Sequence, residues 1–169
     1  QVYGISSIIT DGPTNPLAAM ALANSKNKND KILGNAYGEV DIWKGLKFRS
    51  SLGIEVNNYS SSSFTPGHYL NSATKTDISL VGKGFSRRYT WQVENVLSYN
   101  RTFDKHNVQA LLGHTALKSS FENLGGSRPD LITSDPNMAY IDLATNETLN
   151  KVNGGADVRS LLSYFGRIA

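Results

Sequence analysis

A strict alternation of apolar and polar residues over 41–56, "DIWKGLKFRSSLGIEV", is the feature that most constrains the fold. After residues 43–45, the even-numbered residues from Leu46 to Val56 are apolar except Ser50, and the odd-numbered ones include Lys47, Arg49 and Glu55. Because successive side chains of a β-strand point to opposite faces, this run predicts a strand with one apolar and one polar face. The short connection predicts a hairpin with a preceding strand over 31–42.

The same alternation recurs further along the chain. It predicts strands over 87–103, 107–121 and 159–169, with a second tight turn at 104–106, and an earlier strand over 2–10. The stretch "PLAAMALA" is long enough for two helical turns. Residues 57–86 and 122–157 are polar and predict two long loops, so short and long connections alternate. Such loops are uncommon in compact soluble domains, where about 12–15 residues is already long.

Composition excludes several classes of protein. Charged residues make up 18% of the chain, against about 25% in typical soluble domains. The absence of cysteine excludes disulfides and thiolate metal sites. The basic residues are scattered and the net charge is only +3, which argues against nucleic acid as a partner. No apolar run approaches the roughly 18–20 residues of a membrane-spanning helix.

A transmembrane β-barrel explains the two-faced strands and the unequal connections, because such barrels have short periplasmic turns, long outer loops and aromatic girdles. We therefore expect an all-β, antiparallel barrel segment with residues 43–45 and 104–106 at one rim. The side chains expected to face lipid are Leu46, Phe48, Leu52, Ile54, Trp91, Val93 and Leu97. Those expected to face the lumen are Glu39, Asp41, Lys47, Arg49, Glu55, Gln92 and Glu94. A soluble β-sandwich, such as a carbohydrate-binding module, has the same periodicity and is the alternative.

The number of strands bears on whether the barrel is closed by this chain alone. About six strands are predicted, and the last has no partner that would close a sheet. An open edge in lipid leaves backbone groups unsatisfied at several kcal/mol each. We therefore expect residues 1–169 to be an arc of a single larger barrel domain. The chain starts at Gln1 and ends inside a predicted strand, which fits a fragment.

Three segments carry a resemblance to a known family: "KILGNAYGEVDIWKGLKFRSSLGIEV", "YTWQVENVLSYNRTFDKHNVQALLGHTA" and "LLSYFGRIA". They resemble, in this order, successive barrel segments of SusC/RagA-family TonB-dependent outer-membrane transporters. The matching elements cover most of residues 31–169, and the loops diverge. Where the family has Glu directly after the Trp, this chain has Gln92-Val93-Glu94.

The resemblance implies import of a large or oligomeric nutrient, a glycan or a peptide, across the bacterial outer membrane. Members of the family have a barrel of about 22 strands closed by a plug. The implied partners are the rest of the barrel and the plug, a SusD-like surface lipoprotein that acts as a lid, TonB, and outer-membrane lipid. The plug and the TonB-contact segment are expected to lie N-terminal to Gln1, outside this chain.

Histidines and polar strand or loop residues are the candidates for chemistry or binding. The three histidines, His68, His106 and His114, have no acid or nucleophile at a spacing that marks a triad or a metal site. We expect no enzyme activity and no cofactor. Polar strand residues are expected to solvate the lumen and contact the plug, with direct substrate contact as the alternative. Substrate contact, or else packing against neighbouring loops or the lid, is expected from Phe64, His68, Tyr69, Asp130, Asp135 and Tyr140.

Overall fold

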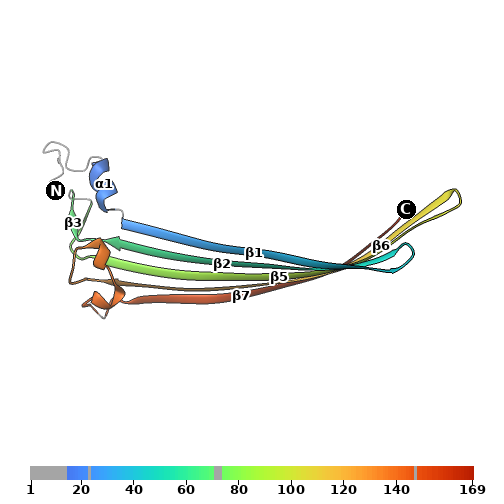
Figure 1. Cartoon of the computed structure of the whole chain (residues 1–169). Helices are drawn as coiled ribbons and strands as arrows, with labels where there is room; N and C mark the ends of the chain where they lie inside the picture. Colours follow the sequence, from blue (N-terminus) through green and yellow to red (C-terminus); the bar gives the residue numbers. More distant parts are fainter. Residues whose placement is uncertain (1–14, 23, 71–73, 147) are drawn as a thin grey trace. The chain divides into compact units, whose positions relative to one another are not determined.

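The computed structural model describes residues 15–22, 24–70, 74–146 and 148–169. Five long strands form one sheet in the order β1-β2-β5-β6-β7. Their bounds are β1 (Asn24–Trp43), β2 (Leu46–Thr65), β5 (Leu80–Phe103), β6 (His106–Pro129) and β7 (Lys151–Ile168). Each strand pairs with the next long strand along the chain (Figure 1). This up-and-down antiparallel order confirms the predicted all-β class.

A second sheet is very small. β3 (His68–Tyr69) pairs with β4 (Lys75–Thr76) in an antiparallel register that places His68 opposite Thr76. A β-sandwich requires two extensive sheets packed face to face. Within the described ranges the chain has only one extensive sheet, so the sandwich alternative is not supported.

The strands are longer than predicted, and the predicted loop bounds are wrong. Polar segments that resembled loops, 57–65 and 80–86 on one side and 122–129 and 151–156 on the other, belong to strands. Asn, Ser, Thr and Gly are weak strand formers, but strand formation depends strongly on pairing with neighbours. The connections between the long strands are therefore residues 66–79 and 130–150, shorter than the predicted 57–86 and 122–157.

Both tight turns are present at the predicted positions, at residues 44–45 and 104–105. Gly45 has a φ of +82°, and the backbone N–H of Asn100 donates to its carbonyl oxygen at 2.8 Å. A Cβ at Gly45 would overlap the carbonyl oxygen of Asn100, which explains the glycine. Since Asn100 precedes the second turn by only a few residues, both turns lie at the same end of the sheet. The prediction that they share a rim is confirmed.

Helical structure is minor. α1 (Pro16–Leu22) matches the helical turns expected for "PLAAMALA", and two short 3₁₀ helices, η1 (Pro136–Met138) and η2 (Ile141–Leu143), lie in the second long connection. In the described part of the chain, no helix is long and apolar enough to cross a membrane. The strand predicted over 2–10 lies outside the described residues.

The chain divides into two units. The turn unit comprises residues 30–58, 87–122 and 156–169, and therefore holds both tight turns. The loop unit comprises the described parts of 1–29, 59–86 and 123–155, and therefore holds both long connections. The large buried apolar side chains, Phe64, Val81 and Leu131, all lie in the loop unit. Leu112, Leu162 and Tyr164 of the turn unit, by contrast, are each more than half exposed.

Candidate functional site: a two-faced wall and a loop cluster

Ion pairs place four of the predicted lumenal residues on one face of the turn unit. Lys47 Nζ lies 2.7 Å from Glu39 Oε1 and 3.9 Å from Asp41 Oδ1. Lys31 Nζ lies 2.9 Å from Glu55 Oε1. These contacts join β1 to β2 across a half-exposed surface. The alternation predicted from the sequence thus brings oppositely charged side chains together on one face of β1 and β2. This face, which carries Lys31, Glu39, Asp41, Lys47 and Glu55, is the charged face.

The remaining three predicted lumenal residues lie on the same face. The Arg49 guanidinium stacks over the Tyr37 ring at 4.2 Å from its centroid, between the two ion pairs. Gly53 of β2, which shares a face with Glu55, lies beside Gln92 of β5. Glu94 follows two residues later, and its Oε2 accepts a hydrogen bond from the Thr115 hydroxyl of β6 at 3.3 Å. The charged face therefore extends over β1, β2, β5 and β6.

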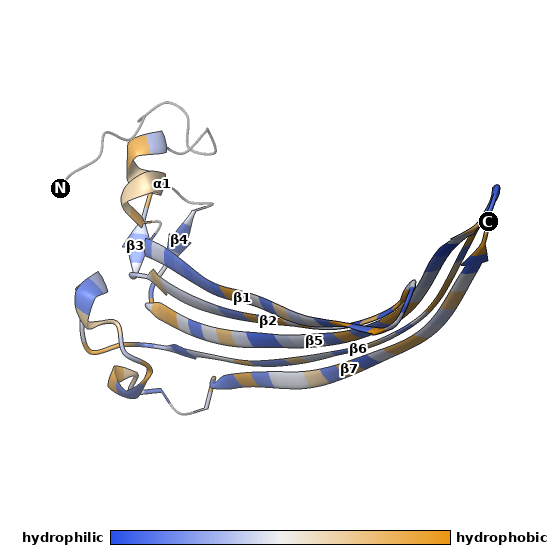
Figure 2. Ribbon diagram, turned by 45° about the vertical axis from the view of Figure 1, so that its right-hand side comes forward, coloured by the Kyte–Doolittle hydropathy of each residue, from blue (hydrophilic) through white to orange (hydrophobic). Residues whose placement is uncertain are grey.

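The residues predicted to face lipid alternate with this set and share the opposite, apolar face. Along these strands Figure 2 shows hydrophilic and hydrophobic residues alternating. Leu46 of β2, Leu97 and Tyr99 of β5 and Leu112 of β6 line one apolar groove of about 530 Å³. The other predicted members are Phe48, Leu52, Ile54, Trp91 and Val93, of which Leu52 is 43% and Ile54 37% exposed.

A polar row interrupts the apolar face. Asn95 Nδ2 and His114 Nδ1 are 3.5 Å apart, and the His114 ring lies 5.1 Å from the Tyr164 ring, tilted by 46°. These residues come from β5, β6 and β7. Sequence reasoning treated His114 as an ordinary histidine, and only the register of three strands reveals the row. The register itself is fixed by paired backbone hydrogen bonds, such as those between Gln109 and Ala169 at 2.9 Å.

Two aromatic contacts on the charged face were also missed. The Arg88 guanidinium lies 5.1 Å from the centroid of the Phe121 ring. The Phe165 ring of β7 occupies the space above Gly113 of β6, where a Cβ would overlap it. An aromatic side chain covering a cross-strand glycine is a known device for fixing strand register. Neither contact has a signal in the sequence, because each depends on which residues face each other across strands.

The loop residues predicted to bind substrate do different things. Phe64 is only 3% exposed and packs in a cluster with Val81, Leu131, Ala139 and Ala144. Its ring is therefore a core element of the loop unit. His68 is half-buried, and its Nδ1 lies 2.9 Å from the Pro66 carbonyl oxygen.

The two aspartates serve the local loop structure. Asp130 has a φ of 64° and a carboxylate that accepts a hydrogen bond from the Thr145 hydroxyl at 3.0 Å. Asp135 caps η1, where its Oδ1 accepts from the Asn137 backbone N–H at 2.9 Å. Tyr69 and Tyr140 are 63% and 60% exposed. Of the six predicted contact residues, these two present accessible aromatic rings.

No grouping of three or more His, Asp or Glu side chains suited to a metal ion occurs among the residues that the structure describes. The charged face and the loops instead offer ion pairs, hydroxyls and aromatic rings.

Comparison with known proteins shows which proteins this chain is similar to. No family model matches the chain. It is 26% identical over 169 residues to TonB-dependent receptor P3 and 29% identical over 163 residues to TonB-dependent receptor P39, both of Formosa agariphila. The chain spans only 16% and 14% of the length of these receptors.

Solved structures share the fold. The RagAB peptide transporter superposes with a TM-score of 0.80 at 19% identity, over 90% of this chain and 17% of that one. The RagAB peptide importer in its open-open state gives a TM-score of 0.82 at 19% identity, over 99% of this chain and 18% of that one.

The single antiparallel sheet and its two unlike faces define a wall segment of an outer-membrane β-barrel. Both curated relatives are TonB-dependent receptors and the solved neighbours are RagAB, so the resemblance to the SusC/RagA family predicted from the sequence is confirmed.

Proposed function

We propose that this chain forms part of the barrel wall and surface loops of a protein that imports a large or oligomeric nutrient across the outer membrane in a TonB-dependent manner. The observation that carries the proposal is the two-faced sheet. Its apolar face has large side chains exposed, and its opposite face is crossed by ion pairs. The similarity to two TonB-dependent receptors, over 98% and 91% of this chain, supports the same function.

The proposal assigns each face an environment. The apolar face contacts lipid, because burying Leu52, Ile54 and their neighbours in acyl chains removes them from water. The charged face lines the lumen, where Glu39, Lys47 and Arg49 are solvated by water or by polar groups of the plug. In this arrangement residues 1–169 belong to one barrel domain, and the plug and the TonB-contact segment belong to other parts of a longer protein.

Partners follow from the same assignment. A SusD-like surface lipoprotein would cover the mouth of the barrel, as the resemblance to the SusC/RagA family implies. Tyr69 and Tyr140 are the residues best suited to meet substrate or lid, since their rings are exposed. Aromatic rings stack on sugars and pack on peptides alike, so both substrate classes fit.

The experiment is an uptake assay in the source bacterium with the parent gene deleted. We expect loss of growth on one oligosaccharide or peptide mixture, and restoration by the intact gene but not by a gene lacking its TonB-contact segment. The parent protein should stay in the membrane fraction after carbonate washing. Release into the wash, or undiminished uptake of every oligomeric nutrient tested, would contradict the proposal.

A further inference from the structure

A groove with charged and aromatic walls lies on the apolar face of the turn unit, at the end of this unit away from the tight turns. Its volume is about 410 Å³, and it lies across β5, β6 and β7. Arg87 and Tyr89 of β5, Ser120 and Glu122 of β6 and Val158 of β7 line it. The groove therefore combines charge with apolar surface on a face that is otherwise apolar.

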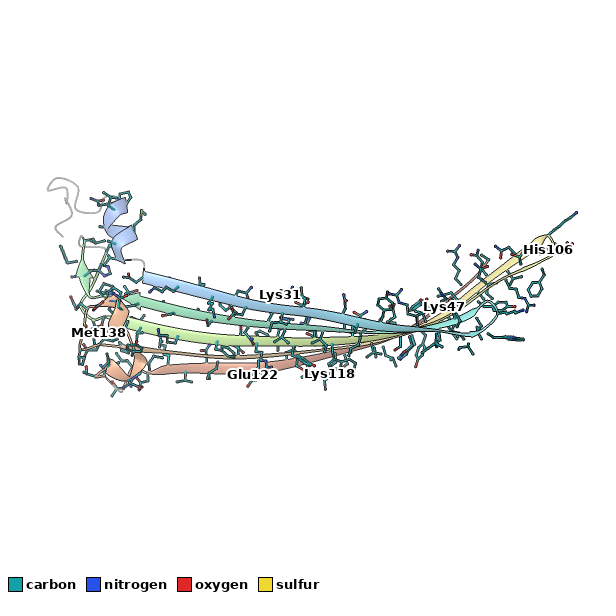
Figure 3. All side chains as sticks on the ribbon, viewed as in Figure 1. Lys31, Lys47, His106, Lys118, Glu122 and Met138 are labelled. Atoms are coloured by element: carbon teal, nitrogen blue, oxygen red, sulfur yellow. The ribbon has the colours of Figure 1, made fainter. Side chains whose placement is uncertain are left out.

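A second basic residue adjoins the groove. Thr90 and Ser119 meet on the charged face, where their hydroxyls are 2.9 Å apart. Because side chains alternate, their neighbours Trp91 and Lys118 lie opposite each other on the apolar face. Lys118 is labelled with Glu122 on β6 in Figure 3. Arg87 and Lys118 thus flank Tyr89 and Trp91.

Neither basic side chain has an ion-pair or hydrogen-bond partner within the described part of the chain. Arg87 and Lys118 are exposed, and among the described residues they form no ion pair or side-chain hydrogen bond. Glu122 lines the same groove as Arg87 but is not within the 4.0 Å of an ion pair. The site therefore keeps an excess of positive charge.

The depth of the site points to a lipid headgroup. A transmembrane strand crosses the bilayer in about 9–11 residues, with aromatic girdles at both interfaces. Along β5, Tyr99 lies near the second tight turn, and Tyr89 and Trp91 precede Tyr99 by about that number of residues. If the turns are periplasmic, as in other such barrels, Arg87 and Lys118 lie at the outer interface. Basic residues at an interface attract anionic lipid.

We propose that Arg87 and Lys118 bind the phosphate groups of an anionic lipid of the outer leaflet, with Tyr89, Trp91 and Val158 contacting the apolar part of that lipid. The proposal rests on the proposed function, because it needs the apolar face to meet the membrane. The guanidinium forms two parallel hydrogen bonds to phosphate oxygens, and the ammonium adds a point charge. Glu122 opposes the binding through its negative charge.

The test uses the intact parent protein, extracted in detergent, with diphosphorylated lipid A as the probe and its dephosphorylated form as the comparison. In the R87Q/K118Q double variant we expect binding of the phosphorylated form to weaken by roughly 30-fold. Each basic residue near an anionic lipid surface contributes about fivefold. E122Q should bind more tightly than wild type. R101Q is the matched control, because Arg101 shares a face with Tyr99, two residues before it, but lies near the tight turns. This variant should bind as wild type.

Several outcomes would overturn the site. Equal binding by wild type and the double variant, equal binding of phosphorylated and dephosphorylated lipid A, or an equal loss in R101Q would each do so. Full competition by inorganic phosphate at concentrations similar to the lipid would show a site for free anions instead. Failure of the proposed function would appear differently, as a wild-type parent protein that carbonate removes from membranes.

Discussion

The loop unit and the turn unit bury their side chains in opposite ways. In the loop unit, Phe64 and Val81 at the ends of two strands pack on Leu131, Ala139 and Ala144 of the second long connection. In the turn unit, large apolar side chains such as Leu52 and Leu162 stay exposed within the chain. The loop unit has its own hydrophobic core. The turn unit has an exposed apolar face that is suited to burial in a membrane.

The two units therefore draw their folding stability from different sources. The loop unit gains from burial within the chain, at about 25 cal/mol per Å² of apolar surface. The turn unit gains from its strand ladder and from whatever covers its faces. Substitutions of the same kind should therefore have unlike effects in the two regions.

The largest effect is expected for Phe64→Ala. Removing a buried aromatic ring costs about 3–5 kcal/mol, because the space it leaves refills only partly. Hydrogen exchange should accelerate at Leu131 and Ile132, whose backbone N–H groups donate to the Ser79 hydroxyl at 2.8 Å and to the Leu143 carbonyl at 3.1 Å.

The matched control is Phe48→Ala on the apolar face, where acyl chains can occupy the vacated space. It should cost less, and it should leave exchange at Leu131 and Ile132 unchanged. The free energy of unfolding of the parent protein is measured in micelles. An equal loss for the two substitutions would contradict the proposed difference between the units.

The second prediction concerns Leu52→Arg in the turn unit. If Leu52 faces the middle of the bilayer, a charge there costs about 2–4 kcal/mol, falling to about 0–1 near an interface. Ser51→Arg is the control, because residue 51 lies on the charged face, where water or a carboxylate can solvate the guanidinium. Urea unfolding in lipid vesicles measures both. A larger penalty at residue 51 than at residue 52 would reverse the assignment of the faces.

The third prediction separates turn geometry from face chemistry. Gly45→Ala places a Cβ on a residue with positive φ, against the carbonyl oxygen of Asn100. A non-glycine residue held in this region costs about 1–3 kcal/mol. Gly38→Ala on β1 should be neutral or slightly stabilising, because nothing lies within 4 Å of its Cβ position. Thermal unfolding of the two variants checks the difference, and a Gly38 variant as unstable as the Gly45 variant would refute it.

Sequence reasoning succeeded where the signal was local. Alternation around Lys47 and Leu52 was enough to predict the all-β class and strands with two unlike faces, because side chains of a strand alternate with a period of two. Which face meets lipid stays a prediction. Sequence reasoning failed at the polar strand ends, where Ser61 and Ser62 resemble a loop although Ser62 accepts a hydrogen bond from Lys83 Nζ of β5 at 2.6 Å. Strand pairing, which no local pattern encodes, decides such segments.

The same limit explains the outcomes at single residues. An isolated aromatic in "SSSSFT" resembles an exposed binding residue, yet Phe64 is buried by residues 131–144, far along the chain. His114 was dismissed because its sequence neighbours offer no partner, and its contacts with Asn95 and Tyr164 come from adjacent strands. Tyr69 and Tyr140 are exposed, as their polar sequence surroundings suggest, and their contact with substrate or lid stays a prediction.

The smallest effect on stability is expected for Tyr140→Ala, and it tests what the loop unit is for. Its ring is 60% exposed and lies outside the cluster around Phe64, so its loss should change the free energy of unfolding by less than about 0.5 kcal/mol. If the ring contacts substrate or the lid lipoprotein, uptake should nevertheless fall severalfold, because exposed aromatic residues often carry binding energy at such surfaces.

Tyr140→Phe keeps the ring and removes only the hydroxyl, so it should retain uptake if stacking is the contact. Met138→Ala, at a residue that is 52% exposed and close in sequence, controls for a general disturbance of the loop. Unchanged uptake in Tyr140→Ala and in the corresponding Tyr69→Ala variant would mean that these loops fold around Phe64 without touching the cargo, and that recognition lies elsewhere in the parent protein.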